Sequence, residues 1–151
     1  MSQVETLQDT VDIDAPPERV WSLVTDLPRM ASWSPQVVRT FVRGPVQRGT
    51  RALNINRRGL LFWPTQSKVV AFEPHREFAF RVQENGTVWA FVLEPTATGT
   101  RLVQERRAPH GIKPISTRLQ DVVLGGVDTF TAELRDGMRE TLGRIKADAE
   151  A

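Results

Sequence analysis

The stretch Leu119–Ile145, LQDVVLGGVDTFTAELRDGMRETLGRI, repeats apolar residues at spacings of three and four, which is typical of one face of an amphipathic helix. That face comprises Leu119, Val123, Val127, Phe130, Leu134, Met138, Leu142 and Ile145. Gly125-Gly126 interrupts the pattern, and each glycine costs roughly 1 kcal/mol relative to alanine inside a helix. We therefore expect a bend at the two glycines, a main helix that begins near Val127 or Asp128, and strong burial of Phe130 and Leu134.

The middle of the chain reads as a series of short strands separated by turn signals. Asn85-Gly86, between two alternating apolar runs, is the strongest hairpin signal. The even spacing of the turns predicts an antiparallel meander and not alternating strands and helices. The expected strands are Leu7–Ile13, Val37–Arg43, Thr50–Arg57, Leu60–Phe72, Glu77–Gln83, Thr87–Glu94 and Thr100–Arg107.

Two short helices are expected between the first two strands. Pro17 can open a helix through Val24, and Pro28 can start a second one that ends at about Ser32. The chain of 151 residues is long enough for one domain, spanning residues 1–151. One long helix against so much sheet can bury its apolar face only by lying across a curved sheet, and this arrangement favours an internal cavity.

The composition excludes several classes of protein. The absence of cysteine rules out disulfides, thiolate metal sites and a cysteine nucleophile. No apolar run approaches the ~20 residues of a spanning helix, and no signal segment is visible at the start of the sequence. We therefore expect a cytoplasmic protein without stable membrane insertion, and we expect it to need no cofactor.

Positive charge is concentrated in the strand region. Residues 37–110 carry twelve Arg and Lys against five Asp and Glu, although the net charge of the whole chain is +2. This surplus fits either solvated outer faces of strands or a surface that attracts an anionic ligand or partner. A net charge of +2 does not indicate nucleic-acid binding.

Aromatic side chains are candidates for a cavity lining, because Ala and Val alone do not fill a deep concavity. Leu134 of the helix joins them. The aromatic candidates are Trp33, Phe41, Trp63, Phe80, Trp89, Phe91 and Phe130.

Polar residues alternate with apolar ones in two of the expected strands. Asn54 and Asn56 share one strand face, and Gln104 and Arg106 share a face of another. Facing inward, their amide and guanidinium groups would need partners; facing outward, they would be ordinary surface, and the alternation leaves both orientations open. The partner of an inward Arg106 would be Glu105, Glu94, another acid or an anionic ligand head group.

The two histidines fit no recognisable metal site, since no carboxylates cluster with them in the sequence. His75 lies in a Pro-His turn and is expected to be solvated. His110 lies in the loop before the helix, where it could stand at a cavity mouth and act as a proton carrier near neutral pH.

Several short motifs, in order along nearly the whole chain, resemble the START-like helix-grip superfamily (SRPBCC), and within it the bacterial polyketide cyclase/dehydratase-like branch. These motifs are Ala15-Pro-Pro-Glu-Arg-Val-Trp21, Asp26-Leu27, Trp33-Ser-Pro35, Gly44-Pro-Val-Gln-Arg-Gly-Thr50, Glu73-Pro74, Leu93-Glu-Pro95 and Gly99-Thr100. The resemblance implies an α+β helix-grip fold: a curved seven-stranded antiparallel sheet around a long C-terminal helix, two short helices after the first strand, and an apolar cavity.

The resemblance implies function less specifically, because the matching residues are turns, caps and packing positions. We expect binding, or carriage, of a hydrophobic small molecule such as a lipid, a polyketide or an aromatic compound. The alternative is a cyclase/dehydratase-type enzyme in which Asn54, Asn56, Gln104 and Arg106 polarise carbonyl groups, although the chain lacks Tyr, which cyclases of this superfamily also use. A third possibility is an interaction module with a basic sheet face, which would have a solid core.

Overall fold

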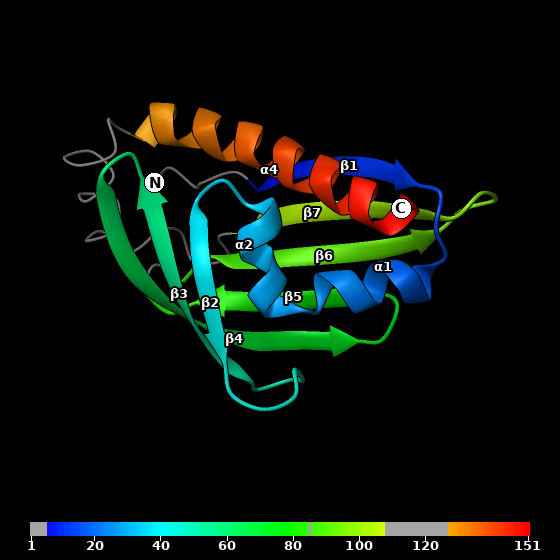
Figure 1. The fold of residues 1–151 in the computed structure, drawn as a ribbon, viewed down its shortest axis with the longest axis horizontal. Helices are drawn as coiled ribbons and strands as arrows, with labels where there is room; N and C mark the ends of the chain where they lie inside the picture. Colours follow the sequence, from blue (N-terminus) through cyan, green and yellow to red (C-terminus); the bar gives the residue numbers. More distant parts are fainter. Residues whose placement is uncertain (1–5, 85, 108–126) are drawn as a thin grey trace.

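The computed structural model describes residues 6–84, 86–107 and 127–151, and the side chains of the last segment from Ala132 onward. Figure 1 shows one sheet with the helices lying across one of its faces. In chain order the elements are β1 (Leu7–Ile13), α1 (Pro17–Val24), the 3-10 turn η1 (Leu27–Arg29), α2 (Met30–Trp33), β2 (Val37–Val42), β3 (Arg51–Arg58), β4 (Leu61–Glu73), β5 (Glu77–Val82), β6 (Val88–Pro95), β7 (Thr100–Arg107) and α4 (Val127–Glu150).

The seven strands form one antiparallel sheet in the order β1-β7-β6-β5-β4-β3-β2. Strands β2 to β7 are a meander in which each strand pairs with the next one, whereas β1 pairs with the last strand, β7. At the predicted hairpin, Phe80 pairs with Trp89, and Gly86 takes a φ of 76°, which favours glycine. The predicted α+β fold, with a curved seven-stranded sheet and a long C-terminal helix, is confirmed.

The helix α4 buries one face against the sheet. Its buried residues recur at spacings of three and four, and α4 contacts β1 and the small helices α1 and α2. They are Leu134, Met138, Thr141, Leu142, Ile145 and Ala149. The described part of α4 starts at Val127, directly after residues that lie outside the description, so the predicted helix start stays a prediction. Gly125-Gly126 and the side chain of Phe130 also lie outside the described residues.

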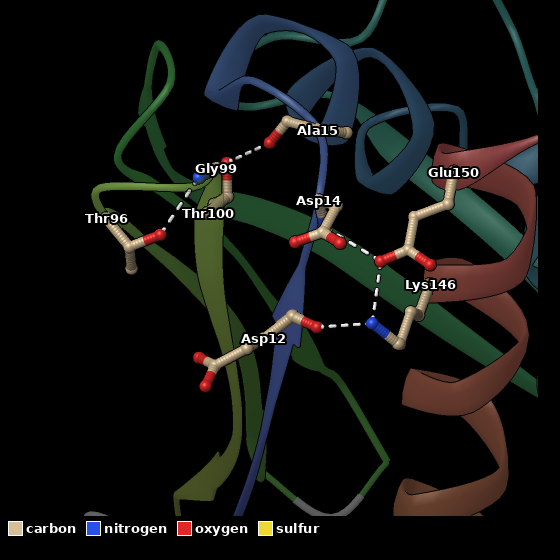
Figure 2. Close-up of polar contacts among 8 residues, drawn as sticks. All are labelled: Asp12, Asp14, Ala15, Thr96, Gly99, Thr100, Lys146 and Glu150. Atoms are coloured by element: carbon tan, nitrogen blue, oxygen red, sulfur yellow. Dashed lines mark hydrogen bonds and ion pairs between the residues drawn. The ribbon is translucent and has the colours of Figure 1, made fainter.

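The C-terminal end of α4 is fastened to the end of β1 by polar contacts (Figure 2). The Lys146 ammonium donates to the Asp12 carbonyl at 2.7 Å, and the Asp14 backbone N–H donates to the Glu150 carboxylate at 2.8 Å. Lys146 and Glu150 also form an ion pair at 2.6 Å. These contacts hold the helix across the open sheet at one end.

The turn before β7 packs against the same segment, also in Figure 2. The Thr100 hydroxyl donates to the Ala15 carbonyl at 2.8 Å. A Cβ atom on Gly99 would lie 2.2 Å from the Ile13 carbonyl oxygen, closer than any real side chain approaches. Glycine is therefore required here, because the backbone of β1 occupies the space of a side chain.

The outer face of β2, β3 and β4 exposes several large apolar side chains. Arginines stack on two of these aromatic rings, Arg39 on Phe41 at 4.9 Å and Arg57 on Phe62 at 5.6 Å. Phe41, Leu53 and Phe62 are exposed on this face. Val38, at the irregularity in β2, Leu60, in the β3–β4 turn, and Leu61, on the opposite face of β4, are also exposed. Within the described residues, no helix is long and apolar enough to cross a membrane.

Candidate ligand cavity

A cavity of about 170 Å³ lies between the concave face of the sheet and the helices α2 and α4. Most of the cavity wall is apolar. The apolar side chains that form it are Leu27, Met30, Pro35, Val37, Trp63, Phe80, Val82, Trp89, Leu134 and Met138. Leu134 and Met138 also pack with Leu7 in a small core cluster that Trp63 and Trp89 border, so the cavity is an extension of the core.

One side of the cavity is a polar wall on β2, β3 and β4. The Thr40 hydroxyl donates to the Asn54 side-chain oxygen at 3.0 Å, and the Asn54 amide donates to the Ser67 hydroxyl at 3.3 Å. The Asn56 amide donates to the Thr65 hydroxyl at 2.9 Å and to the Trp63 carbonyl at 3.2 Å. Both asparagines are thus held in place by neighbouring strands before any ligand arrives.

Polar groups of β7 line another part of the cavity and, unlike the asparagines, have no hydrogen-bond partner among the described residues. Gln104 and Arg106 line the cavity with side chains that are 5% and 3% exposed. The Gln104 Oε1 atom is buried without a hydrogen-bond partner. Burial lowers the pKa of the Arg106 guanidinium from its ordinary value, and no hydrogen bond or ion pair joins it to another described residue.

Two of the partners expected for Arg106, Glu105 and Glu94, do not pair with it; an anionic ligand head group stays a prediction. Glu105 pairs with Arg107 at 2.7 Å, and Glu77 pairs with the same arginine at 3.2 Å, because Glu105 and Arg107 lie on the other face of β7. Glu94 likewise lies on that face, opposite Arg101 and not Arg106.

A carboxylate lines the cavity at the start of α4, but it already has a partner. Glu133 forms a two-point contact with Arg58 of β3, at 2.6 and 2.8 Å. The hydrogen bonds from Arg58 lower the pKa of Glu133, so this carboxylate is ionised near neutral pH. The pair joins α4 to the β3–β4 hairpin beside the cavity.

The structure brings together eight of the residues that the sequence singled out for the cavity. They are Asn54, Asn56, Trp63, Phe80, Trp89, Gln104, Arg106 and Leu134. The alternation in the sequence left open whether the polar faces of β3 and β7 point inward or outward. In the structure, both faces point into the cavity. His110 and the side chain of Phe130 lie outside the described residues.

Three aromatic candidates are placed elsewhere. Trp33 is fully buried in the core, and its indole N–H donates to Asp148 of α4 at 2.7 Å. Phe91 is in the same core cluster, on the part of the inward face of β6 that α1 covers. Phe41 is on the outer face of β2, where Arg39 covers its ring. His75 is exposed in its turn, as predicted.

Other lining residues were missed in the sequence. Thr65 and Ser67 follow Trp63 at two-residue spacing on β4, so strand alternation would have placed them on the same face. Thr40 gives no such signal, because an irregularity between Val37 and Arg39 shifts the phase of β2. The Arg58–Glu133 pair depends on the tertiary fold alone.

Solved structures share this architecture. BexL, a di-domain ARO/CYC from the BE-7585A biosynthetic pathway, matches with a TM-score of 0.74 and 24% identity over 97% of this chain and 50% of that chain. The chain thus spans half the length of that two-domain protein. KanY matches over the full length of both chains, with a TM-score of 0.74 and 19% identity. The Polyketide_cyc-like protein Cgl2372 from Corynebacterium glutamicum is 28% identical, with a TM-score of 0.60, over 93% of this chain and 88% of that chain.

The sequence itself matches a family that is described as polyketide cyclase/dehydrase and lipid transport, over residues 5–150. Among curated proteins, none is significantly similar in sequence. The family match extends from just before β1 to the last turn of α4, and includes every strand of the sheet and every segment that lines the cavity. The chain belongs to the polyketide cyclase/dehydrase and lipid transport family.

Proposed function

We propose that the protein binds a small hydrophobic molecule in the cavity between the sheet and α4. The observation that carries the proposal is a cavity wall that is mostly apolar, formed by residues such as Phe80, Trp89 and Met138, with polar groups on β2, β3, β4 and β7 and at Glu133 of α4. A binding site of this kind takes its affinity from apolar burial and its orientation from a few polar groups. The volume of about 170 Å³ suits a compact one- or two-ring molecule better than a long acyl chain.

Apolar contact alone gives a moderate affinity. A ligand the size of a Trp side chain buries roughly 200 Å². At about 25 cal/mol per Å² this contributes about 5 kcal/mol, from which the cost of association is subtracted. The polar groups therefore decide which molecules bind well.

The test uses two glycines of α4 as a matched pair. Gly137 lines the cavity, and a Cβ there would meet Pro35 at 3.4 Å, whereas a Cβ on Gly143 meets nothing within 4 Å. We expect Gly137→Leu to fill part of the cavity and to weaken binding of naphthalene, measured by calorimetry, at least tenfold. Gly143→Leu should bind like the parent protein.

The proposal fails if the parent protein binds no naphthalene, or if both leucine variants bind it equally well. If the leucine variant does not fold, Gly137→Ala provides a smaller change at the same position. It should weaken naphthalene binding by a smaller factor than Gly137→Leu. Native mass spectrometry of freshly purified protein would show whether a compound co-purifies, and its mass would identify the ligand class.

A cyclase/dehydratase-type enzyme is the second candidate, and one observation favours it: Asn54, Asn56, Gln104 and Arg106 converge on a single cavity. Among the described lining residues, however, the titratable carboxylate is Glu133, which Arg58 keeps ionised, and none is a histidine. An enzyme would remove water from a bound β-hydroxy ketone, and mass spectrometry would detect that loss. A solid-core interaction module does not fit the cavity.

A further inference from the structure

Two polar groups on the inward face of β7, the Gln104 oxygen and the Arg106 guanidinium, have no partner among the described residues. The Gln104 oxygen is buried without a hydrogen-bond partner, and Arg106, 3% exposed, has no ion pair or hydrogen bond to another described residue. The asparagines across the cavity differ, because Thr40, Thr65 and Ser67 are their hydrogen-bond partners. The two groups without such a partner both belong to β7.

A guanidinium keeps its charge at any physiological pH, so Arg106 cannot avoid the cost of burial by losing a proton. A buried charge of this kind is normally paired, and each buried polar atom without a partner is a cost to the fold. The carboxylates of Glu105 and Glu133 are nearest in sequence or in the cavity wall, and each is engaged by another arginine. The missing counter-charge has to come from outside the described residues.

We propose that the ligand of this cavity is a hydroxy acid with a compact ring body, whose acidic group binds Arg106 and whose hydroxyl donates to Gln104. This inference rests on the proposed function and specifies its ligand class. A carboxylate fits the planar fork of a guanidinium with two parallel hydrogen bonds. A hydroxyl supplies the donor that the Gln104 oxygen lacks. The ring body lies against Phe80, Trp89 and Met138.

The spacing of the two groups restricts the ligand further. Residues 104 and 106 are two positions apart on one strand, so their Cα atoms are about 7 Å apart along the cavity wall. A hydroxyl directly beside the carboxylate would bond to that carboxylate instead of to the protein. The better ligand has its hydroxyl in a meta position, one ring carbon further away.

The experiment compares three probes by calorimetry: naphthoic acid, its neutral methyl ester, and a hydroxynaphthoic acid with the hydroxyl meta to the carboxylate. The parent protein should bind the acid roughly 10- to 100-fold more tightly than the ester, as expected for hydrogen bonds between charged groups. Arg106→Met should abolish this preference, because it should weaken binding of the acid far more than binding of the ester. Arg106→Lys should restore only part of the preference, because it keeps the charge but not the fork.

The matched control is Arg101→Met, which removes the same charge from the opposite face of β7. The Arg101 side chain is half exposed and pairs with Asp12 at 3.0 Å, so its loss should leave the acid-to-ester ratio unchanged. Gln104→Leu should abolish the added affinity of the hydroxynaphthoic acid over naphthoic acid, and leave the preference for acid over ester intact.

The outcomes separate the two proposals. If none of the three probes binds the parent protein, the proposed function itself fails. If the ester binds as tightly as the acid, or if Arg106→Met weakens both equally, the cavity binds hydrophobic molecules but the hydroxy-acid proposal is overturned. If Gln104→Leu leaves the hydroxyl preference unchanged, the role assigned to Gln104 is overturned.

Discussion

At Gly99, in the turn before β7, the space that a side chain would need is occupied by the backbone of Ile13 and Ala15. Alanine at this position would place a methyl carbon 2.2 Å from the Ile13 carbonyl and 2.7 Å from the Ala15 nitrogen. We expect Gly99→Ala to lower the free energy of unfolding by about 1–3 kcal/mol in urea denaturation, as overpacking does. The control is Gly143→Ala, on an open stretch of α4, which should raise it by about 0.5–1 kcal/mol. Equal effects of the two changes would contradict the close approach.

Arg106 predicts a second effect at the scale of one residue. Because its buried guanidinium has no partner among the described residues, an apolar side chain of similar length removes a cost and keeps the packing. Without ligand, Arg106→Met should raise the free energy of unfolding by about 1–3 kcal/mol. Arg101→Met on the solvent face should change it by less than about 0.5 kcal/mol. A destabilised Arg106→Met protein would mean that the charge is compensated in the free state.

Residue-level sequence reasoning identified which side chains share a face, but not where the face points. Asn54 and Asn56 alternate with Leu53 and Ile55, and the usual preference would turn the apolar set inward. The structure does the reverse, and Leu53 is 40% exposed while Asn56 is buried. Strand alternation shows which side chains share a face, but it does not show which face points inward. The helix that covers one face of the sheet decides which set is buried.

At the scale of elements, α4 depends on its apolar face. Leu134 is buried against the sheet and borders the cavity. We expect Leu134→Ala to lower the free energy of unfolding by about 2–5 kcal/mol, since a buried large-to-small change loses contacts and leaves a void. Its exposed neighbour provides the control: Arg135→Ala should cost less than about 0.5 kcal/mol. A loss of half a kilocalorie or less in the leucine variant would show that α4 does not close the fold.

The Arg58–Glu133 pair makes the attachment of α4 to the β3–β4 hairpin dependent on pH. Arg58 lowers the pKa of Glu133 in the folded protein. A carboxyl of this kind stabilises the fold above its ordinary pKa, and the contribution is lost as the pH falls through the lowered value. The pair is partly exposed, so the effect is small.

We therefore expect the thermal unfolding midpoint of Glu133→Gln to be lower than that of the parent near pH 7, and the two to converge in acid as the pH falls through the lowered pKa of Glu133. Differential scanning calorimetry across this range provides the measurement. Asp136→Asn is the control, because the Asp136 side chain is 78% exposed and 3.9 Å from Arg139. A constant difference between Glu133→Gln and the parent at every pH would point to lost packing and not to a lost charge.

Most elements could be predicted from sequence because they depend on local signals. The turns and alternation located the seven strands to within a residue or two, and Pro17 and Val24 bound α1 as expected. The segment after it was less accurate, since a 3-10 turn at Leu27–Arg29 precedes a one-turn α2. The predicted bend at Gly125-Gly126 falls outside the described residues and stays a prediction.

At the scale of the whole molecule, a cavity could be predicted from the mismatch between one helix and a large curved sheet. Its exact lining could not, because that lining depends on how the small helices divide the concave face. Near α1 the concave face is filled by core side chains, Phe91 among them, and the described residues there form no cavity lining. The Trp33 indole N–H donates to Asp148 of α4, which keeps this ring in the core. The partner of Arg106 could not be predicted either, because it depends on the tertiary fold. Glu105 points to the outer face of β7, where it pairs with Arg107.

The pairing of β1 with β7 has a consequence for how this protein is made. At roughly 5–20 residues per second, the ribosome needs on the order of 5–20 s to synthesise the chain between these strands. During this time β1 has no partner strand in the sheet, and α4, which covers the apolar concave face, is synthesised after all seven strands. Folding of the domain is therefore completed only once α4 has been synthesised, and a nascent chain stalled before α4 exposes an uncovered apolar sheet to chaperones and proteases.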